Sequence, residues 1–275
     1  LYPDGTEHKR FSTMGFNPYF HSAPFIHEEL SGNAVVSKIH KSVDYVYFYG
    51  AGASSESLKD IIHDGLKRVF KNAAINVDHD LVASAYSTYT GEPAITCILG
   101  TGSNSCFFDG ETVSDEVPAL AYVLGDEGSA SFIGKRLVSD FLYKRLPEEM
   151  AHDFYDTYGL DKDEIITSVY SKPNANVYLA SFSRFAGKHM EHPYVKMIVR
   201  EGFAKFADIH IGCFANATEV PVHFVGSVGA IFHEILEEVL AERGFRMGQI
   251  LRKPVDGLIK YHLEYLNILN AYQVN

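Results

Sequence analysis

The sequence contains little cysteine: three residues in a chain of 275, with no C-x-x-C pair. An odd number of thiols without paired spacing argues against a disulfide framework and against a thiolate zinc site. The sequence also lacks a run of about 18 apolar residues, which a membrane-spanning helix needs. It has no basic-then-apolar stretch of the kind that forms a secretory leader. We therefore expect a cytoplasmic protein without a membrane segment.

Positive charge is also scarce, because 24 Lys and Arg residues stand against 35 Asp and Glu residues, a formal net charge of −11. Nucleic-acid-binding proteins usually carry a basic face, so we expect no nucleic-acid partner. The thirteen histidines are scattered and none forms H-E-x-x-H or another ligand spacing. What the chain does have is 46% apolar residues, enough for the core of one large or two medium domains.

Three short apolar runs predict buried strands, and each ends in a glycine turn. Helical periodicity follows the first and third of these turns, and further helical patterns fill the second half of the chain. Residues 1–6 resemble a strand entering a hairpin turn. The predicted strands are residues 44–49, 94–99 and 222–225, and the predicted helices are residues 58–70, 81–87, 132–146, 164–170, 178–190, a long segment after Pro193, and 231–240.

This order of elements predicts an α/β protein with a helix-rich second half. The dipeptide Asp109-Gly110 lies between two short apolar segments, which is typical of a two-residue hairpin turn. A turn at Gly91-Glu92-Pro93 separates two units that each contain strands. We therefore expect a first lobe of residues 1–91 and a second lobe of residues 92–275.

The turn after the second predicted strand is polar and glycine-rich, at Gly100-Thr101-Gly102-Ser103-Asn104. Glycines there allow successive backbone N–H groups to face inward and bind a phosphate, but an ordinary tight hairpin explains the same residues equally well. A dinucleotide-binding motif is excluded because Ser105 occupies its third glycine position. A P-loop is excluded because the run from Gly128 to Gly134-Lys135 has one residue too many and no hydroxyl after the lysine.

Two acidic clusters precede predicted helices. Asp126 and Glu127 lie in Gly125-Asp126-Glu127-Gly128-Ser129, where Ser129 is a candidate helix cap and helix capping explains one acid better than two. Asp78 and Asp80 flank His79 just before the helical stretch 81–87, and local reasoning favours capping there too. A carboxylate facing a cleft would alternatively accept a proton from a substrate hydroxyl.

The order of three runs resembles N-acetylglucosamine kinases and the wider BadF/BadG/BcrA/BcrD-type ATPases of the actin and sugar-kinase superfamily. The runs are residues 98–104 (ILGTGSN), 125–129 (GDEGS) and 225–228 (VGSV). The similarity extends from about Thr13 to the C-terminal region. The resemblance implies two related, ribonuclease H-like α/β lobes that hold ATP and a sugar in the cleft between them. It also implies a last helix that packs back on the first lobe.

The resemblance assigns roles residue by residue. Asp80, rather than Asp78, matches the carboxylate that deprotonates the attacking hydroxyl. Asn17, in the loop of residues 13–18, together with Thr101 and Asp126, matches positions that contact the sugar. The positions matching the ATP-binding loops and the adenine site are Gly100, Thr101, Gly102, Ser103, Asn104, Ala180, Gly226, Ser227 and Val228.

One motif of the family has no match in this sequence. Members begin with a strand and a D-x-G-x-T-K-like turn, the first phosphate loop, whose Asp helps to organise Mg²⁺. No such turn precedes Leu1, and residues 1–6 resemble the second strand of that hairpin. We therefore expect the metal ligand to lie upstream of Leu1.

The activity implied is ATP- and Mg²⁺-dependent phosphorylation of an amino sugar, N-acetylglucosamine at its 6-hydroxyl, with a homodimer formed through the helical second lobe. One alternative is an ATPase activator of a reductase or dehydratase, which shares an iron–sulfur cluster between subunits. Cys97 and Cys106 lie on predicted buried strands, poor positions for such a cluster. The other alternative is a non-catalytic sugar sensor, which would lack the catalytic carboxylate. The sequence leaves the identity of the sugar open.

Overall fold

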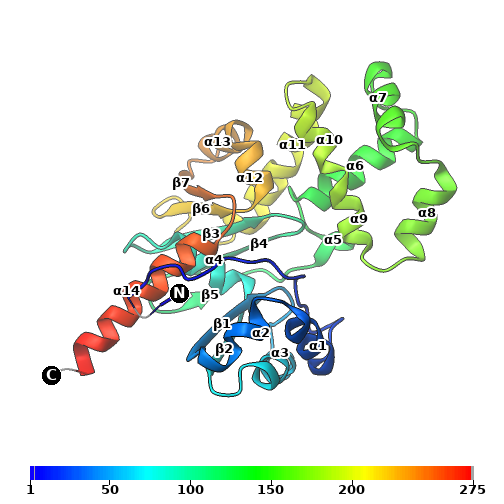
Figure 1. The fold of residues 1–275 in the computed structure, drawn as a ribbon. Coiled ribbons are helices and arrows are strands. Elements are labelled where there is room, and N and C mark those ends of the chain that lie inside the picture. Colours follow the sequence, from blue (N-terminus) through cyan, green and yellow to red (C-terminus); the bar gives the residue numbers. More distant parts are fainter. Residues whose placement is uncertain (3, 274–275) are drawn as a thin grey trace. The chain divides into compact units, whose positions relative to one another are not determined.

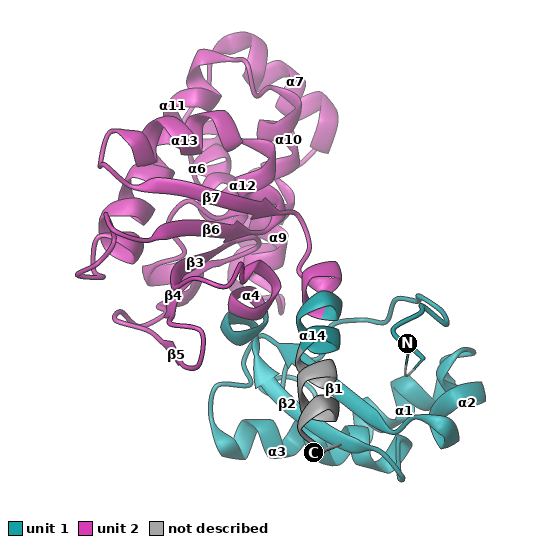
Figure 2. Ribbon diagram, turned by 90° about the vertical axis from the view of Figure 1, so that its left-hand side faces the viewer, with its two compact units in different colours: residues 1–83, 259–275 teal, residues 84–258 magenta. Residues whose placement is uncertain are grey.

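The computed structural model describes residues 1, 2 and 4–273, with side chains up to Glu264 (Figure 1). The chain packs into two compact units, residues 1–83 with 259–275 and residues 84–258 (Figure 2). Each unit has its own hydrophobic core. The division into lobes of residues 1–91 and 92–275 stays a proposal.

The larger unit, residues 84–258, is built on a five-stranded sheet in the order β5-β4-β3-β6-β7. Strands β3, β6 and β7 are parallel, whereas β4 pairs antiparallel with both β3 and β5. Because Ile98 pairs with Val225, β3 and β6 end at the same edge of the sheet. The strands are β3 (Ala94–Leu99), β4 (Ser103–Phe108), β5 (Val113–Ser114), β6 (Pro221–Val225) and β7 (Arg246–Leu251).

The central strands are apolar on both faces, as expected for strands covered on both sides. Every residue of β6 is buried, and in β3 only Ile98 is partly exposed. The predicted hairpin at Asp109-Gly110 is confirmed between β4 and β5, but its connection is four residues, 109–112, rather than the expected two-residue turn, because Phe108 pairs with Val113. Its Asp109 Oδ1 accepts the N–H groups of Glu111 and Thr112, both at 2.7 Å, and Gly110 has φ +105°.

The helices of this unit surround a core rich in phenylalanine, and those from α6 to α13 form the helix-rich part of the chain that the sequence predicts (Figure 1). Helix α11 runs directly into the π-helix η2. The helices are α4 (Asp80–Thr88), which begins in the smaller unit, α5 (Ala121–Leu124), α6 (Ala130–Leu142), α7 (Glu148–Tyr158), α8 (Lys162–Tyr170), α9 (Ala175–Ser181), α10 (Ser183–Lys188), α11 (Pro193–Phe206), η2 (Ala207–Ile211), α12 (Ser227–Ile231) and α13 (His233–Ala241).

The smaller unit contains two parallel strands, β1 (Tyr45–Gly50) and β2 (Ala74–His79). Helices α1 and α3 pack so closely at Gly65 of α3 that no side chain would fit there. A Cβ atom on Gly65 would lie 2.8 Å from Cβ of Ile26. The helices are α1 (Ala23–Gly32), α2 (Val36–Ile39), the 3-10 helix η1 (His40–Ser42) and α3 (Glu56–Val69).

The last helix, α14 (Val255–Gln273), belongs to the smaller unit from Ile259 onward. There His262 joins β1 through two tyrosines. Its Nε2 lies 2.8 Å from the hydroxyl of Tyr49, and its ring stacks on Tyr47 with centroids 4.1 Å apart. Tyr47 and Tyr49 are two residues apart on β1 and so lie on the same face, and these contacts hold the helix against that face of the two-stranded sheet.

Two predicted elements are wrong. The described residues of the expected strand at 1–6 form no strand: the N–H of Tyr2 donates to the carbonyl of Thr6, and the N–H of Gly5 donates to that of Tyr2, both at 2.9 Å. The helix expected at residues 132–146 ends at Leu142, because Lys144 adopts φ +57° and reverses the chain. Strands β2 and β7 and helices α1, α2, α5 and α7 were not predicted.

Candidate functional site

Two of the three glycine turns meet at the edge of the larger sheet. Gly226, directly after β6, has φ +134°, and its N–H donates to the carbonyl of Leu251 at 2.8 Å. A Cβ atom on Gly226 would lie 2.2 Å from the carbonyl oxygen of Leu99 and 3.0 Å from the nitrogen of Gly100. Only glycine allows the backbone of one turn to approach the other so closely.

The acidic turn of residues 125–129 joins the same group through the start of α6. The N–H of Ala130 donates to the carbonyl of Gly100 at 2.9 Å, and the N–H of Ser131 donates to that of Thr101 at 3.1 Å. The predicted cap is confirmed, since Ser129 Oγ accepts the N–H of Phe132 at 3.2 Å. The turn after β3 is therefore fixed to the N-terminal end of α6.

Asp126 places its carboxylate on this turn. Its backbone is left-handed, with φ +56°, and Oδ1 accepts the N–H of Ser103 at 3.1 Å. A Cβ atom on Gly102 would lie 2.8 Å from Oδ1, so the carboxylate occupies the space that a side chain at 102 would fill. Burial raises the pKa of Asp126, the Ser103 N–H lowers it, and the neighbouring charge of Glu127 raises it again.

The turn has donors that suit a phosphate group. Among the described residues, no hydrogen bond uses the N–H group of Thr101 or of Gly102. The Ser103 hydroxyl is buried and likewise has no partner there. Successive free N–H groups in a glycine-rich turn form the kind of concave site that binds phosphate oxygens.

The other residues matched to the ATP loops differ in their surroundings. Ser227, the first residue of α12, is exposed and Val228 is buried. Asn104 Oδ1 accepts the N–H of its neighbour Ser105 at 2.9 Å. Ala180 is half-buried on α9, which packs so tightly on α6 that a Cβ atom on Gly134 would overlap the backbone of α9. Their roles toward a nucleotide stay predictions.

The two carboxylates at the end of β2 have different environments. Asp78 pairs with Lys59 at 3.1 Å and also accepts the N–H of His79 at 3.0 Å. Asp80 is half-buried at the start of α4, and burial raises its pKa, an effect opposed by the charge of His79. Of the two, Asp80 has the environment of a stronger base.

Asn17 lies in a loop that is held against the turn after β1. Its Oδ1 accepts the N–H of Tyr19 at 3.0 Å, and its own N–H donates to Nδ1 of His21 at 3.0 Å. A Cβ atom on Gly52, which has φ +85°, would lie 2.6 Å from Asn17 Oδ1. The asparagine therefore packs on the chain where β1 ends, and its contact with a sugar stays a prediction.

Sequence reasoning missed the partner of Glu127. Its Oε2 lies 3.3 Å from Nε2 of His210, whose side chain is 5% exposed, and Nδ1 of that ring has no partner among the described residues. The π-helix η2 carries His210, and such bulges occur often at functional sites. Because the two residues are 83 positions apart, no local pattern joins them.

The described residues contain no group of three or more His, Cys, Asp or Glu side chains arranged to hold a metal ion. Within the same part of the chain, none of the helices combines the length and the apolar composition that a bilayer span demands.

Comparison with solved structures places the chain in a family. A crystal structure of a candidate N-acetylglucosamine kinase from Porphyromonas gingivalis is 34% identical, with a TM-score of 0.90, over 96% of this chain and 94% of that one. A candidate N-acetylglucosamine kinase from Chromobacterium violaceum is 16% identical, with a TM-score of 0.55, over 71% of this chain and 70% of that one, which shows similarity of fold.

No protein-family model and no curated protein matches the sequence. The similarity to the Porphyromonas gingivalis protein nevertheless extends over almost the whole of both chains. The expected α/β fold of the actin-like ATPase type is confirmed. The chain belongs to the N-acetylglucosamine kinase-like family of the actin and sugar-kinase superfamily.

Proposed function

We propose that the protein is a sugar kinase that transfers the γ-phosphoryl group of ATP to the 6-hydroxyl of N-acetylglucosamine. One observation carries this proposal: the turns at Gly100, Asp126 and Gly226 meet at one edge of the sheet. They bring together N–H groups that have no partner among the described residues and a carboxylate that can accept hydrogen bonds from sugar hydroxyls. Support for the substrate comes from the Porphyromonas gingivalis relative, which is described as a candidate kinase of this sugar.

The proposed reaction is an in-line displacement. Asp80 accepts the proton of the 6-hydroxyl while that oxygen bonds to the γ-phosphorus, and the bond to the bridging oxygen breaks to release ADP. The N–H groups of Thr101 and Gly102 would donate to phosphoryl oxygens, which stabilises the negative charge that they carry in the transition state. A carboxylate with a raised pKa accepts a proton more readily near neutral pH than an ordinary aspartate does.

In this proposal Mg²⁺ would bind together with the nucleotide. In kinases this ion is held largely by substrate phosphates and one or two carboxylates, so a preformed cage of several side chains is not required. Bound there, the ion would offset the charge of the phosphates. The described residues contain no such cage.

On the sugar side, Asp126 and Asn17 are the proposed hydrogen-bonding partners of the substrate hydroxyl and amide groups. The Asp126 carboxylate is held by the N–H of Ser103, which leaves its remaining lone pairs to accept from hydroxyls. Fixing the carboxylate in advance reduces the loss of side-chain entropy on binding.

The alternative of an iron–sulfur ATPase activator is less well supported. Cys97 and Cys106 are fully buried on β3 and β4, and burial raises the pKa of the Cys97 thiol well above its ordinary value. Cluster ligands are thiolates, so a buried neutral thiol inside a sheet is a poor ligand for a cluster shared with another subunit.

A coupled assay that measures ADP release tests the function. ATP and Mg²⁺ would be supplied with N-acetylglucosamine, glucosamine, N-acetylmannosamine and glucose in parallel, and the product position would be identified by phosphorus–proton correlation in NMR. The expected result is turnover that requires sugar, with the highest kcat/KM for N-acetylglucosamine. ADP release at the same rate without any sugar would contradict the proposal.

Replacement of Gly102 tests the position of Asp126. Gly102→Ala adds a Cβ atom 2.8 Å from Asp126 Oδ1, so the carboxylate must move away from the N–H of Ser103. The displaced carboxylate would then lose its proposed hydrogen bond to a sugar hydroxyl. A charge-assisted bond of about 1.5–3 kcal/mol corresponds to an increase in sugar KM of about 10-fold or more. The matched control is Gly32→Ala at the end of α1, outside the candidate site, where an added Cβ atom would meet nothing within 4 Å. Equal effects of the two changes would count against the assignment.

A further inference from the structure

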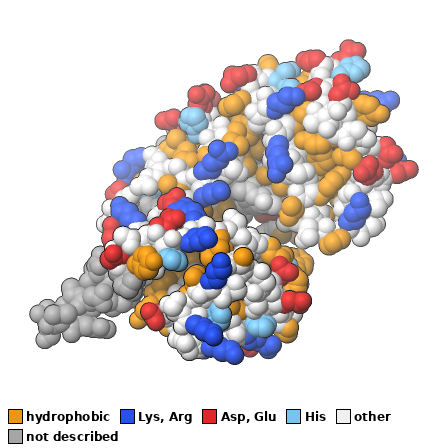
Figure 3. Space-filling view, viewed as in Figure 1, with side chains coloured by type: hydrophobic (Ala, Val, Ile, Leu, Met, Phe, Trp, Pro, Cys, Tyr) orange, Lys and Arg blue, Asp and Glu red, His pale blue; other side chains and the backbone are white. Residues whose placement is uncertain are grey.

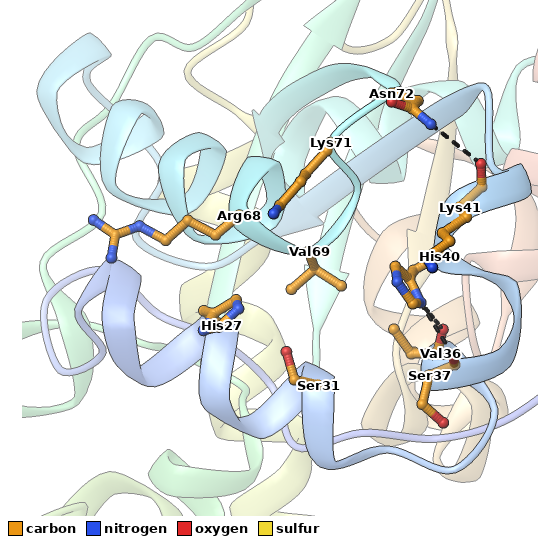
Figure 4. Close-up of a pocket in the computed structure, with 10 residues that line it drawn as sticks. All are labelled: His27, Ser31, Val36, Ser37, His40, Lys41, Arg68, Val69, Lys71 and Asn72. Carbon is orange, nitrogen blue, oxygen red and sulfur yellow. Dashed lines mark hydrogen bonds between the residues drawn. The ribbon is translucent and has the colours of Figure 1, made fainter.

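A cavity of about 480 Å³ lies within the smaller unit, between helix α1, the segment α2–η1, and the end of α3 with the residues that follow it (Figure 4). A volume of this size is typical of sites for small molecules. Neither the resemblance nor the proposed kinase reaction gives it a role. Its lining residues are His27, Ser31, Val36, Ser37, His40, Lys41, Arg68, Val69, Lys71 and Asn72.

Hydrogen bonds and packing hold the walls of this cavity in place. Asn72 Nδ2 donates to the carbonyl of Lys41 at 3.4 Å, which joins the chain after α3 to η1. His40 Nδ1 lies 3.1 Å from the carbonyl oxygen of Ser37 on the same wall. Val36 and Val69 are buried members of the core of this unit, so the apolar base of the cavity is part of the fold.

The charge of the cavity is of one sign. Lys41, Arg68 and Lys71 line it together with two histidines, and none of the ten lining residues is acidic. Across the described part of the chain, no ion pair involves any of these three cations. Exposed Lys and Arg side chains gather on this part of the molecule (Figure 3). The cavity is therefore positively charged in a chain whose net charge is −11.

A helix dipole accounts for only part of this charge. Arg68 lies in the last turn of α3, where a cation is stabilised by the carbonyl groups of the helix end. Lys71 lies beyond the end of that helix, and Lys41 lies on the opposite wall, on η1. Figure 4 shows Lys71 extending toward His27, with Lys41 and His40 across the cavity and Arg68 directed outward at the rim.

We propose that this cavity binds the phosphate ester of a small polyol or sugar. Lys41 and Lys71 would contact the phosphate from two sides through charge-assisted hydrogen bonds, and the charge of Arg68 at the rim would attract the anion over a longer distance. The hydroxyls of Ser31 and Ser37 would hydrogen-bond to the polyol part of the ligand, and Val36 and Val69 would contact its carbon atoms. The site lies within one unit and does not depend on the proposed kinase activity.

Calorimetric titration of the whole chain with glucose 6-phosphate, glycerol 3-phosphate and inorganic phosphate tests this proposal without any turnover. Saturating N-acetylglucosamine would be present so that the candidate catalytic site is occupied. We expect the esters to bind, and the double substitution Lys41→Gln with Lys71→Gln to weaken their binding by about 100-fold, since each charge-assisted hydrogen bond lost corresponds to about 10-fold.

Lys38→Gln is the matched control, because Lys38 is an exposed cation of α2 that does not line the cavity, and its loss is expected to change the affinity by less than about 2-fold. All three lysines are exposed, so thermal unfolding of the variants should match that of the wild type. Three results would overturn the proposal: no ester binding at millimolar concentration, equal weakening by the control, or binding of inorganic phosphate as tight as that of the esters.

Discussion

Asp80→Asn is expected to lower kcat for sugar phosphorylation by about 10²–10⁴-fold, the usual contribution of a positioned base. Asparagine keeps the shape and polarity of the side chain but cannot accept the hydroxyl proton. The affinity for N-acetylglucosamine, measured by calorimetry without nucleotide, should change by less than about 3-fold, because the substitution removes a group that acts in the transition state.

Asp78→Asn is the matched control for this experiment. Asp78 lies two residues away and is engaged by Lys59 and by the N–H of His79, so its loss should affect the local fold more than the chemical step. If Asp78→Asn abolished turnover while Asp80→Asn retained it, the roles of the two carboxylates would be reversed. If neither substitution changed kcat, a base at the end of β2 would be excluded.

The raised pKa of Asp80 adds a pH dependence. A base must be unprotonated to act, so kcat/KM should fall as the pH decreases through a value above that of an ordinary aspartate. The same shift affects stability: the contribution of Asp80 is fully present below its unfolded-state pKa and is lost as the pH rises through the folded-state value. At neutral pH, Asp80→Asn should therefore unfold at a temperature no lower than the wild type.

Local pattern was sufficient to predict the strands that are most buried. Residues 94–99 were predicted as a strand with the bounds that β3 has, and residues 222–225 differ from β6 by one residue. Both runs are almost continuously apolar and end at glycine, so propensity and burial agree there. Strand β2 was missed because Asn76 and Asp78 interrupt its apolar residues, and its pairing with β1 stabilises it instead.

The candidate site could be predicted as separate pieces only. The sequence indicated a polar glycine turn, an acidic turn and a second glycine turn, and each had an ordinary explanation by itself. Their meeting depends on the parallel pairing of β3 with β6 and on hydrogen bonds between residues such as Ser103 and Asp126, which are 23 positions apart. The cavity of the smaller unit is a similar case, since Lys41 and Lys71 line one cavity only when the chain after α3 lies beside η1.

Gly226→Ala is expected to destabilise the protein by about 4 kcal/mol or more, the range reached when a substitution creates an overlap that cannot relax. The added Cβ atom would lie 2.2 Å from the Leu99 carbonyl oxygen, and a backbone atom inside a sheet cannot move aside as a side chain can. The backbone at φ +134° is also unfavourable for alanine. Urea unfolding followed by circular dichroism measures the change.

Gly244→Ala is the comparison variant, because it replaces a glycine of positive φ that has space around it. Gly244 has φ +73° after α13, but a Cβ atom there would meet nothing within 4 Å, so its replacement should cost only the left-handed backbone term of about 1–2 kcal/mol. The difference between the two variants then combines the overlap of the turn after β6 with the end of β3 and the higher backbone cost of φ +134°. Equal destabilisation by both would mean that the two turns do not touch, and the proposed nucleotide site would lose the contact that joins its loops.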